Sequence, residues 1–233
     1  AELQVTPEDM MQRFGKIITE VNKLISRMVP AEFKKEWMVD AQAGTVAFGS
    51  AYHNWATSLP FMAKKNVNFK QIYEFMEKEQ KRELAQAAPL HEVLLDMIVE
   101  KLPSADDAQK YRIPHIWRGE AEEDIGQAMV NADGKGDSAF MVTKVVLDPH
   151  AGEIAVGRLF SGSIKKGDQM YVAGMPNANR VQSVGMFVGG DRIATETVTA
   201  GNIIAVSGLR DAQSGSTISS NKEMTPFERI VHN

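Results

Sequence analysis

The sequence contains no cysteine, which excludes disulfide bonds, Cys-ligated zinc, iron–sulfur clusters and thiol catalysis. Aromatic residues make up only 7% of the 233 residues, and no apolar run approaches the ~18 residues of a membrane span. The net charge of −4 argues against a protein that binds nucleic acid through bulk charge. A hydrophobic fraction of 43% excludes wholesale disorder. We therefore expect a globular, cytoplasmic protein without membrane contact, of one large domain or two smaller ones.

Catalytic constellations are also missing. The histidines are scattered, with no HExxH motif or pair at metal-ligand spacing; they are His53, His91, His115, His150 and His232. There is no GxSxG elbow, and the polar stretch Gly134–Asp137 lacks the spacing of a phosphate loop, so a hairpin tip is the better interpretation. The sequence thus offers no catalytic residue and no metal site.

Glycine usage divides the chain. Residues 1–113 hold three of the 18 glycines, and residues 114–233 hold the other fifteen. A glycine-poor half followed by a glycine-rich half predicts helices followed by strands and tight turns, which is an α+β protein.

Helix signals are clearest in the first half. Thr6–Asp9 supplies an N-cap hydroxyl, a proline at the first helical position and acids at the positive helix end. Apolar residues then recur every three or four positions over 10–28, which predicts a stripe facing a core, until Pro30 ends the helix. Asn68 is expected to cap a second helix and Pro89 to open a third.

Two further segments carry predictions. The apolar run 44–50 predicts a buried strand that leads into a loop and a short helix around Trp55. The small residues of that loop would let backbone N–H groups approach a planar ligand edge such as a guanine carbonyl, whereas an ordinary turn needs the same residues for its geometry. Residues 103–118 are polar and contain prolines, so a linker is expected there.

The second half contains six short apolar runs separated by turn residues, which predict a closed β-barrel or a sandwich. The runs are 138–147, 154–161, 169–173, 180–187, 201–207 and 215–219. Gly157 and Gly162 bracket one strand, in which we expect Arg158 and Phe160 to face opposite sides. Gly167 is expected to take a positive φ in the following turn.

Several motifs resemble translation factors. Segments 37–51 and 108–114 resemble the archaeal and eukaryotic elongation factor 2 family. The stretch GRLFSGSIKKGD at 157–168 is similar to the second-domain signature of translational GTPases, and 200–206 is similar to a later strand of that barrel. Because the barrel motif is shared, a release or initiation factor is an alternative on the barrel alone, disfavoured by the 108–114 motif.

This resemblance implies an organisation. Residues 1–113 would be a mainly helical remnant of a P-loop GTPase domain, 114–220 a six-stranded antiparallel β-barrel, and 221–233 a linker toward a following domain. The family's phosphate loop, DxxG and NKxD motifs are all placed earlier than the Ser50–Ala51 loop, and none occurs ahead of that loop here, so the chain is interpreted as an internal fragment. GTP and magnesium would belong to the parent factor, and we expect this chain alone to bind no cofactor and to hydrolyse no GTP.

The resemblance also implies a function. The parent would use GTP hydrolysis to move tRNA and mRNA through the ribosome, with the barrel resting on small-subunit rRNA beside the remaining domains of the factor. The carried-over guanine-side residues are Gly49, Ser50 and Ala51. The candidate rRNA contacts are Arg158, Lys165, Lys166 and Arg180, for which solvated surface charge is an equal alternative. The rival hypothesis is a helical and β-barrel adaptor, or an RNA-binding module, that never held a nucleotide.

Overall fold

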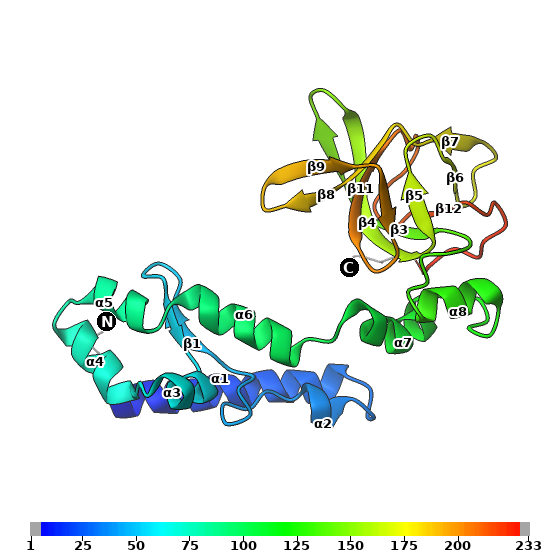
Figure 1. The fold of residues 1–233 in the computed structure, drawn as a ribbon. Coiled ribbons are helices and arrows are strands. Elements are labelled where there is room, and N and C mark those ends of the chain that lie inside the picture. Colours follow the sequence, from blue (N-terminus) through cyan, green and yellow to red (C-terminus); the bar gives the residue numbers. More distant parts are fainter. Residues whose placement is uncertain (1–5, 229–233) are drawn as a thin grey trace. The chain divides into compact units, whose positions relative to one another are not determined.

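The computed structural model describes residues 6–228, and the chain divides into two compact units, Ala1–Leu102 and Pro103–Asn233 (Figure 1). The sequence had suggested residue 113 as the boundary. Each unit has a hydrophobic core of its own. No helix among residues 6–228 is long and apolar enough to cross a bilayer.

Helix α1 (Pro7–Met28) begins as predicted. The Thr6 hydroxyl accepts a hydrogen bond from the backbone N–H of Asp9 at 3.2 Å, and Pro7 occupies the first turn. Glu8 and Asp9 place negative charge at the positive end of the helix. The helix ends at Met28, two residues before Pro30.

The other helices of the first unit surround a small core. They are α2 (Lys34–Trp37), α3 (Leu59–Lys65), α4 (Phe69–Glu77), α5 (Lys81–Ala87) and α6 (Leu90–Lys101). Asn68 and Gln71 form a capping box at the start of α4, and Pro89 is the N-cap of α6, so both predicted helix starts are confirmed. The fully buried core side chains are Ala56, Phe61, Ile72, Leu84, Ala88 and Val93.

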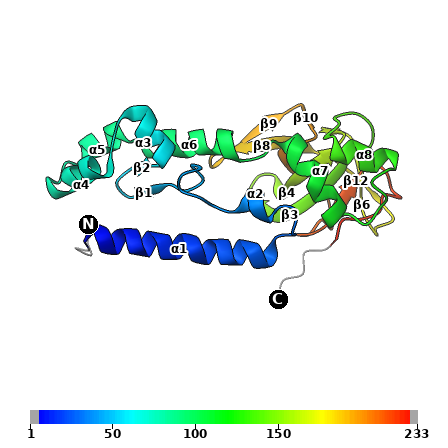
Figure 2. The ribbon, with the colours of Figure 1, turned by 90° about the horizontal axis from the view of Figure 1, so that it is seen from below.

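The predicted burial of the α1 stripe is only partly right, because Met10, Phe14, Ile18 and Ile25 are half-buried while the rest of the stripe is exposed. Ile17, Leu24 and Met28 remain 56%, 59% and 82% exposed. Helix α1 contacts the rest of the unit through the Phe14 ring, whose centre lies 4.7 Å from that of Phe48. It also does so through Asn22, whose side-chain amide donates to the carbonyl of Val39 and accepts from its N–H, both at 2.8 Å. Figure 2 shows α1 on one side of β1 and β2, opposite α3–α5. The spacing of the apolar residues therefore predicted an apolar face of α1 correctly, but it did not show whether other residues of the chain bury that face.

A hairpin replaces the predicted buried strand and short helix. Strand β1 (Phe48–Ser50) takes only the last three residues of the predicted run, and its Gly49 is exposed. Trp55 starts strand β2 (Trp55–Thr57) instead of a helix. The reason is Asn54, whose φ of 56° closes a four-residue loop and turns the chain back onto β1.

Residues 103–118 are not a linker. They contain helix α7 (Ala105–Ile116), capped by the Ser104 hydroxyl, which accepts from the N–H of Asp107 at 3.2 Å. Pro114 falls in the last turn, where its missing N–H removes a single bond, and the N–H of Trp117 still donates to Ile113 at 3.0 Å. Because α7 packs on the second unit, the boundary falls after Leu102.

The second unit is an antiparallel β-barrel with two helices, α7 and α8 (Asp124–Val130). Its strands are β3 (Ala139–Asp148), β4 (Gly152–Ser161), β5 (Ser163–Lys165), β6 (Gln169–Val172), β7 (Ala178–Arg180), β8 (Ser183–Val188), β9 (Asp191–Thr195), β10 (Thr197–Thr199), β11 (Ile203–Ser207) and β12 (Thr217–Ser219). Eight form one sheet in the order β7-β6-β12-β3-β4-β11-β8-β9, and β10 pairs with β5.

The predicted number of six strands is too low for this barrel. One predicted run, 180–187, is divided between β7 and β8, and three short strands between the glycine turns were missed. The expected positive φ of Gly167 is confirmed at 95°. The prediction of an α+β protein with an antiparallel barrel is confirmed.

The first four residues of strand β3, 139–142, are buried on both faces of the sheet. Phe140 and Val142 point into the barrel core, whereas Ala139 and Met141 pack into a second cluster with the helices. This second cluster covers the outer barrel face with side chains from α7, α8 and the C-terminal segment; its buried members are Ile113, Trp117, Met129, Ala139, Met141, Phe160, Met224 and Phe227. A strand covered on both faces loses the polar alternation of an exposed sheet.

The described part of the predicted C-terminal linker, 221–228, packs on this cluster. The Trp117 indole N–H donates to the carbonyl of Thr225 at 2.7 Å, and the Phe227 N–H donates to the Thr217 hydroxyl at 2.8 Å. Met224 and Phe227 are buried. Residues 221–228 are therefore packed against the barrel, residues 229–233 lie outside the described residues, and a connection from 221–233 toward a following domain stays a prediction.

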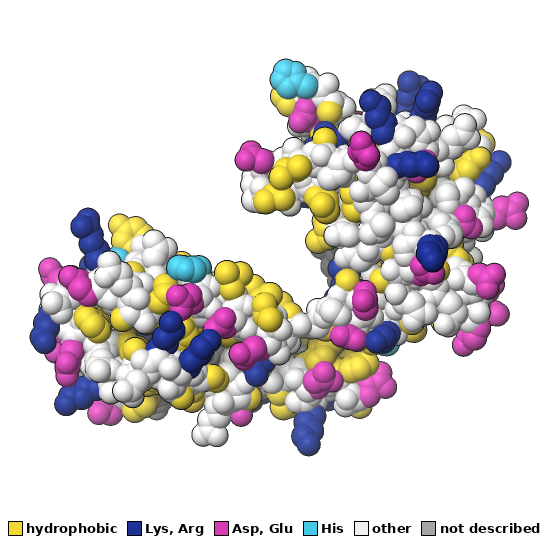
Figure 3. Space-filling model, in the orientation of Figure 1, with side chains coloured by type: hydrophobic (Ala, Val, Ile, Leu, Met, Phe, Trp, Pro, Cys, Tyr) yellow, Lys and Arg dark blue, Asp and Glu magenta, His cyan; other side chains and the backbone are white. Residues whose placement is uncertain are grey.

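Helix α6 presents an apolar face to solvent, visible as hydrophobic side chains gathered along it in Figure 3. The exposed members are Leu94, Leu95, Ile98, Val99 and Leu102, of which Val99 is 82% exposed. We expect this face to drive self-association of the chain. Leu95→Glu with Val99→Glu should weaken it about tenfold in sedimentation velocity across a concentration series.

Tyr52→Glu is the matched control for that measurement, because Tyr52 is 90% exposed but lies outside this face. It should leave the concentration dependence unchanged. Equal behaviour of the α6 double variant and the unmodified chain would contradict the prediction.

The buried amide of Gln109 yields a stability prediction. Its Nε2 donates to the carbonyls of Met129 and of Phe160, the latter at 2.9 Å, and the side chain is fully buried. Gln109→Met keeps the volume but removes both bonds, and should cost about 2–4 kcal/mol of unfolding free energy. Hydrogen exchange of β4 peptides in urea measures the loss, because β4 carries Phe160.

Gln127→Met is the control for this change. Gln127 also donates to a backbone carbonyl, that of Ala121 at 2.8 Å, but from an exposed position. Its replacement should cost no more than about 0.5 kcal/mol. Equal losses from the two variants would show that the buried bridge contributes nothing special.

Candidate functional site

The guanine-side candidates Gly49, Ser50 and Ala51 lie together where β1 enters its hairpin loop. The strands approach closely at Gly49, where an added Cβ would lie 2.4 Å from the carbonyl oxygen of Trp55. The Ser50 hydroxyl accepts a hydrogen bond from the N–H of His53 at 3.3 Å, which shapes the loop. The arrangement is a small-residue edge held by a tight turn, and the Ser50 hydroxyl is the one polar side-chain group among residues 49–51.

This hairpin is anchored at its base. The Phe48 ring lies 4.7 Å from that of Phe14 and 5.9 Å from that of Phe69. The N–H of Ala56 donates to Ala88 at 3.0 Å, so the segment before α6 extends the hairpin on its second side. The loop is therefore carried by packed structure. A contact of residues 49–51 with guanine stays a prediction.

Three of the four basic candidates come together. The turn from Lys165 to Asp168 follows β5, and its Gly167 N–H donates to the carbonyl of Val181 at 2.9 Å. This places Arg180 beside the turn, its Nη2 3.9 Å from where a Cβ on Gly167 would lie. The side chains of Lys165, Lys166 and Arg180 are exposed, and no ion pair among residues 6–228 neutralises them.

Asp168 supports this basic turn locally. Its carboxylate accepts from the backbone N–H of Lys165 at 2.9 Å, so this acid is committed to the turn. Three positive side chains around a rigid turn make a local surface suited to phosphate oxygens.

Arg158 lies elsewhere, and the predicted opposite orientation of Arg158 and Phe160 is wrong. The Arg158 guanidinium carbon is 5.8 Å from the centre of the Phe160 ring, because positions i and i+2 of a strand share a face. Burial lowers the pKa of Arg158, the charge of Arg112 lowers it further, and Tyr111 acts in the opposite direction. Its Nε and Nη2 atoms are buried without a hydrogen-bond acceptor.

A cavity of about 410 Å³ adjoins Arg158. It is lined by Arg112, Ile116, Met141, Thr143, Arg158, Phe160 and Glu228. Arg112 was not a candidate in the sequence analysis, because residues 103–118 were expected to form a linker and not a helix. The available signal was the spacing of Arg112 and Ile116, four residues apart and therefore on one helical face.

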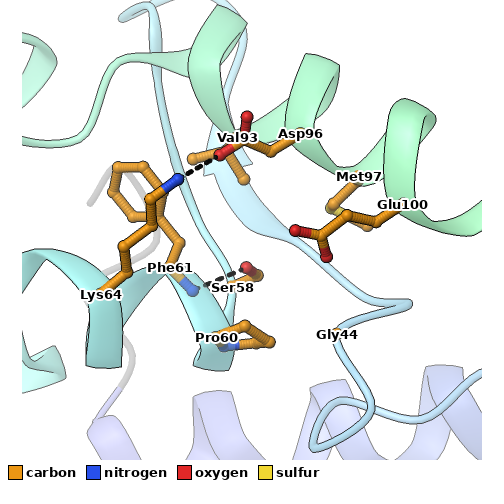
Figure 4. Close-up of a pocket in the computed structure, with 9 residues that line it drawn as sticks. All are labelled: Gly44, Ser58, Pro60, Phe61, Lys64, Val93, Asp96, Met97 and Glu100. Carbon is orange, nitrogen blue, oxygen red and sulfur yellow. Dashed lines mark hydrogen bonds and ion pairs between the residues drawn. The ribbon is translucent and has the colours of Figure 1, made fainter.

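A second cavity, of about 50 Å³, lies between α3 and α6 (Figure 4). Lys64 Nζ is 3.1 Å from an oxygen of Asp96 at its mouth, and this contact raises the pKa of Lys64. The volume suits about one water molecule, so this cavity is too small for a nucleotide base.

Within residues 6–228 no group of three or more His, Asp or Glu side chains is placed to hold a metal ion.

Comparison with known proteins addresses the family. Residues 152–219, from β4 to β12, match the family model "Elongation factor Tu domain 2". Over 231 residues, 99% of this chain, the sequence is 52% identical to elongation factor 2 of Picrophilus torridus. It is likewise 52% identical to elongation factor 2 of Pyrococcus horikoshii over 229 residues and of Thermoplasma volcanium over 231.

The chain spans about 31% of the length of these relatives. The similarity covers both structural units, since it extends over 98% or more of the chain. The predicted resemblance to archaeal elongation factor 2 is therefore confirmed, and an unrelated adaptor is disfavoured.

The close approach at Gly49 gives a prediction. Gly49→Val places a side chain against the backbone of β2 and should open the hairpin, at a cost above about 2 kcal/mol. Amide hydrogen exchange of residues 48–57 should then rise at least tenfold. Ala51→Val, at an exposed loop position, is the control and should leave the exchange nearly unchanged. Wild-type protection in the Gly49 variant would show that the strands can separate freely.

Proposed function

We propose that this chain, a relative of archaeal elongation factor 2 over nearly its whole length, is the part of a ribosomal translocation factor that joins a guanine-side hairpin to a ribosome-contacting barrel. The observation that carries the proposal is the 52% identity over 99% of the chain, across both units. In the parent factor, GTP binding and hydrolysis would drive tRNA and mRNA through the ribosome in the cytoplasm.

The hairpin would contribute the last guanine contact. Gly49 lets β2 approach β1 closely, the Ser50 hydroxyl shapes the loop, and the backbone at the exposed residue Ala51 would be the part that a planar ligand edge reaches. A phosphate loop and an NKxD motif do not occur in this sequence, and its one DxxG match, at residues 133–136, lies in the second unit, so GTP and magnesium would be held by other residues of the parent. In this proposal the chain alone lacks the groups that supply most of the nucleotide affinity.

The barrel would contact small-subunit rRNA through the turn at 165–168 and Arg180. Support comes from Lys165 and Lys166 on the turn and Arg180 beside it, all exposed and without an ion pair among residues 6–228, in a chain whose overall charge is −4. Such phosphate contacts add affinity without base specificity and weaken as salt rises. Arg158 is half-buried behind Phe160 and is not included in this surface.

The test uses the full-length factor containing this chain. Lys165→Glu with Lys166→Glu should weaken ribosome binding at least tenfold at low salt. It should also flatten the dependence of log K on log salt by about one to two, because about one counterion is released per phosphate contact. Ribosome co-sedimentation across a salt series measures both quantities.

Lys135→Glu with Lys222→Glu is the matched control, with the same charge change at two exposed positions outside the turn. It should retain the salt slope of the unmodified factor. If the pair at 165 and 166 behaves like this control, the turn does not contact rRNA.

A further inference from the structure

We propose that the 410 Å³ cavity between α7 and the β3–β4 face binds a carboxylate side chain presented by an acidic protein segment. The cavity lies entirely within the second unit. It involves neither the hairpin at 49–51 nor the turn at 165–168. The inference is therefore independent of the proposed function.

Two β-bulges build the cavity floor. The ladder of β3 and β4 shifts register twice, which leaves Thr143 and Phe160 without a partner residue across the ladder. The freed carbonyl of Thr143 accepts from the Ser214 hydroxyl at 2.7 Å, and that of Phe160 accepts from Gln109 at 2.9 Å. Bulges bend a strand and redirect side chains. With both carbonyls satisfied, this bent floor is a fixed part of the fold.

The charges on the wall are uncompensated. Arg112 and Arg158 both line the cavity, and no ion pair among residues 6–228 involves either of them. Arg158 Nε and Nη2 are buried without an acceptor, which is costly for a charged group. Glu228, the acid on the lining, is already paired with Arg118. The cavity wall thus carries two guanidinium groups, and that of Arg158 has buried N–H groups for which the described residues supply no acceptor.

The remaining wall favours a carboxylate on an apolar stem. Ile116, Met141 and Phe160 give the lining its apolar character. A glutamate side chain would bury its methylene groups against these residues and bring its oxygens to the arginines. A backbone phosphate of RNA is strongly hydrated and would be better matched by the exposed basic turn at 165–168. Charge and shape therefore favour an acidic protein segment.

The test follows the arginine Nε–H signals of the 233-residue chain by ¹⁵N NMR. The probe is 4-methylpentanoate, which combines a carboxylate with an apolar stem, and its neutral counterpart is 4-methylpentanamide. The acid should shift the Arg158 signal in a saturable way, and the amide should bind at least tenfold more weakly. Inorganic phosphate should also bind more weakly than the acid.

Variants make the assignment specific. Arg112→Gln, at an exposed position of α7, should weaken the acid about tenfold or more, while Arg112→Lys keeps the charge and should restore most of the affinity. Lys144→Gln is the matched control, because Lys144 is exposed on β3 next to Thr143 but does not line the cavity. It should change the affinity less than twofold.

Three results would overturn the proposal. Equal binding of acid and amide would show an apolar cavity without anion recognition. Equal losses in the Lys144 and Arg112 variants would show diffuse charge attraction. Tighter binding of inorganic phosphate, or displacement of the acid by a single-stranded RNA oligonucleotide, would assign the cavity to nucleic acid.

Discussion

The second unit depends on one buried amide. Gln109 projects from α7 and donates to carbonyls on α8 and on β4, so a single side chain joins both helices to the barrel. The Phe160 carbonyl is available because the β3–β4 ladder slips at that residue. Without Gln109 it would be buried and unpaired, at a cost of about 1–3 kcal/mol. The bulge and Gln109 therefore depend on each other: the bulge leaves the Phe160 carbonyl without a partner in the ladder, and the Gln109 side chain on α7 donates a hydrogen bond to it.

Much of the neighbouring structure follows from that joint. Once α7 and α8 cover the outer barrel face, Met141 and Phe160 become core residues on the side of the strand that would otherwise meet water. Arg158 shares that face and lies at the edge of the covered area, so its guanidinium is partly buried. In the same packing Trp117 and Phe227 form an antiparallel bridge, and the Trp117 indole donates to the Thr225 carbonyl. These contacts attach residues 221–228 to the barrel. The position of the Arg158 charge beside the apolar side chains of Met141 and Phe160 thus results from how α7 and α8 cover the outer face of the barrel.

The sequence predicted features governed by neighbouring residues. Thr6, Asn68 and Pro89 mark helix starts because caps act within one turn, and Gly167 was identifiable because the tight turn between two apolar runs requires a positive φ. The failures involve longer-range packing. Polarity and prolines suggested a linker at 103–118, whereas Gln109 and Ile113 are buried by residues far along the chain. The proximity of Arg180 to Gly167, and of Arg112 to Arg158, likewise depends on strand pairing and bulges that local patterns do not encode.

The two units differ in how completely they bury their apolar surface. In the second unit, clusters on both sides of β3 enclose large residues such as Phe140 and Trp117 almost fully. The first unit has one small cluster, while α1 and α6 each present an apolar stripe to solvent. Burial contributes roughly 25 cal/mol per Å² of apolar surface, so exposed stripes of this kind favour association with further protein. The hairpin of this unit is held by the contacts of the Phe48 ring with Phe14 and Phe69. Because Phe14 belongs to α1, any protein that covers the α1 stripe would pack beside a residue that holds the hairpin.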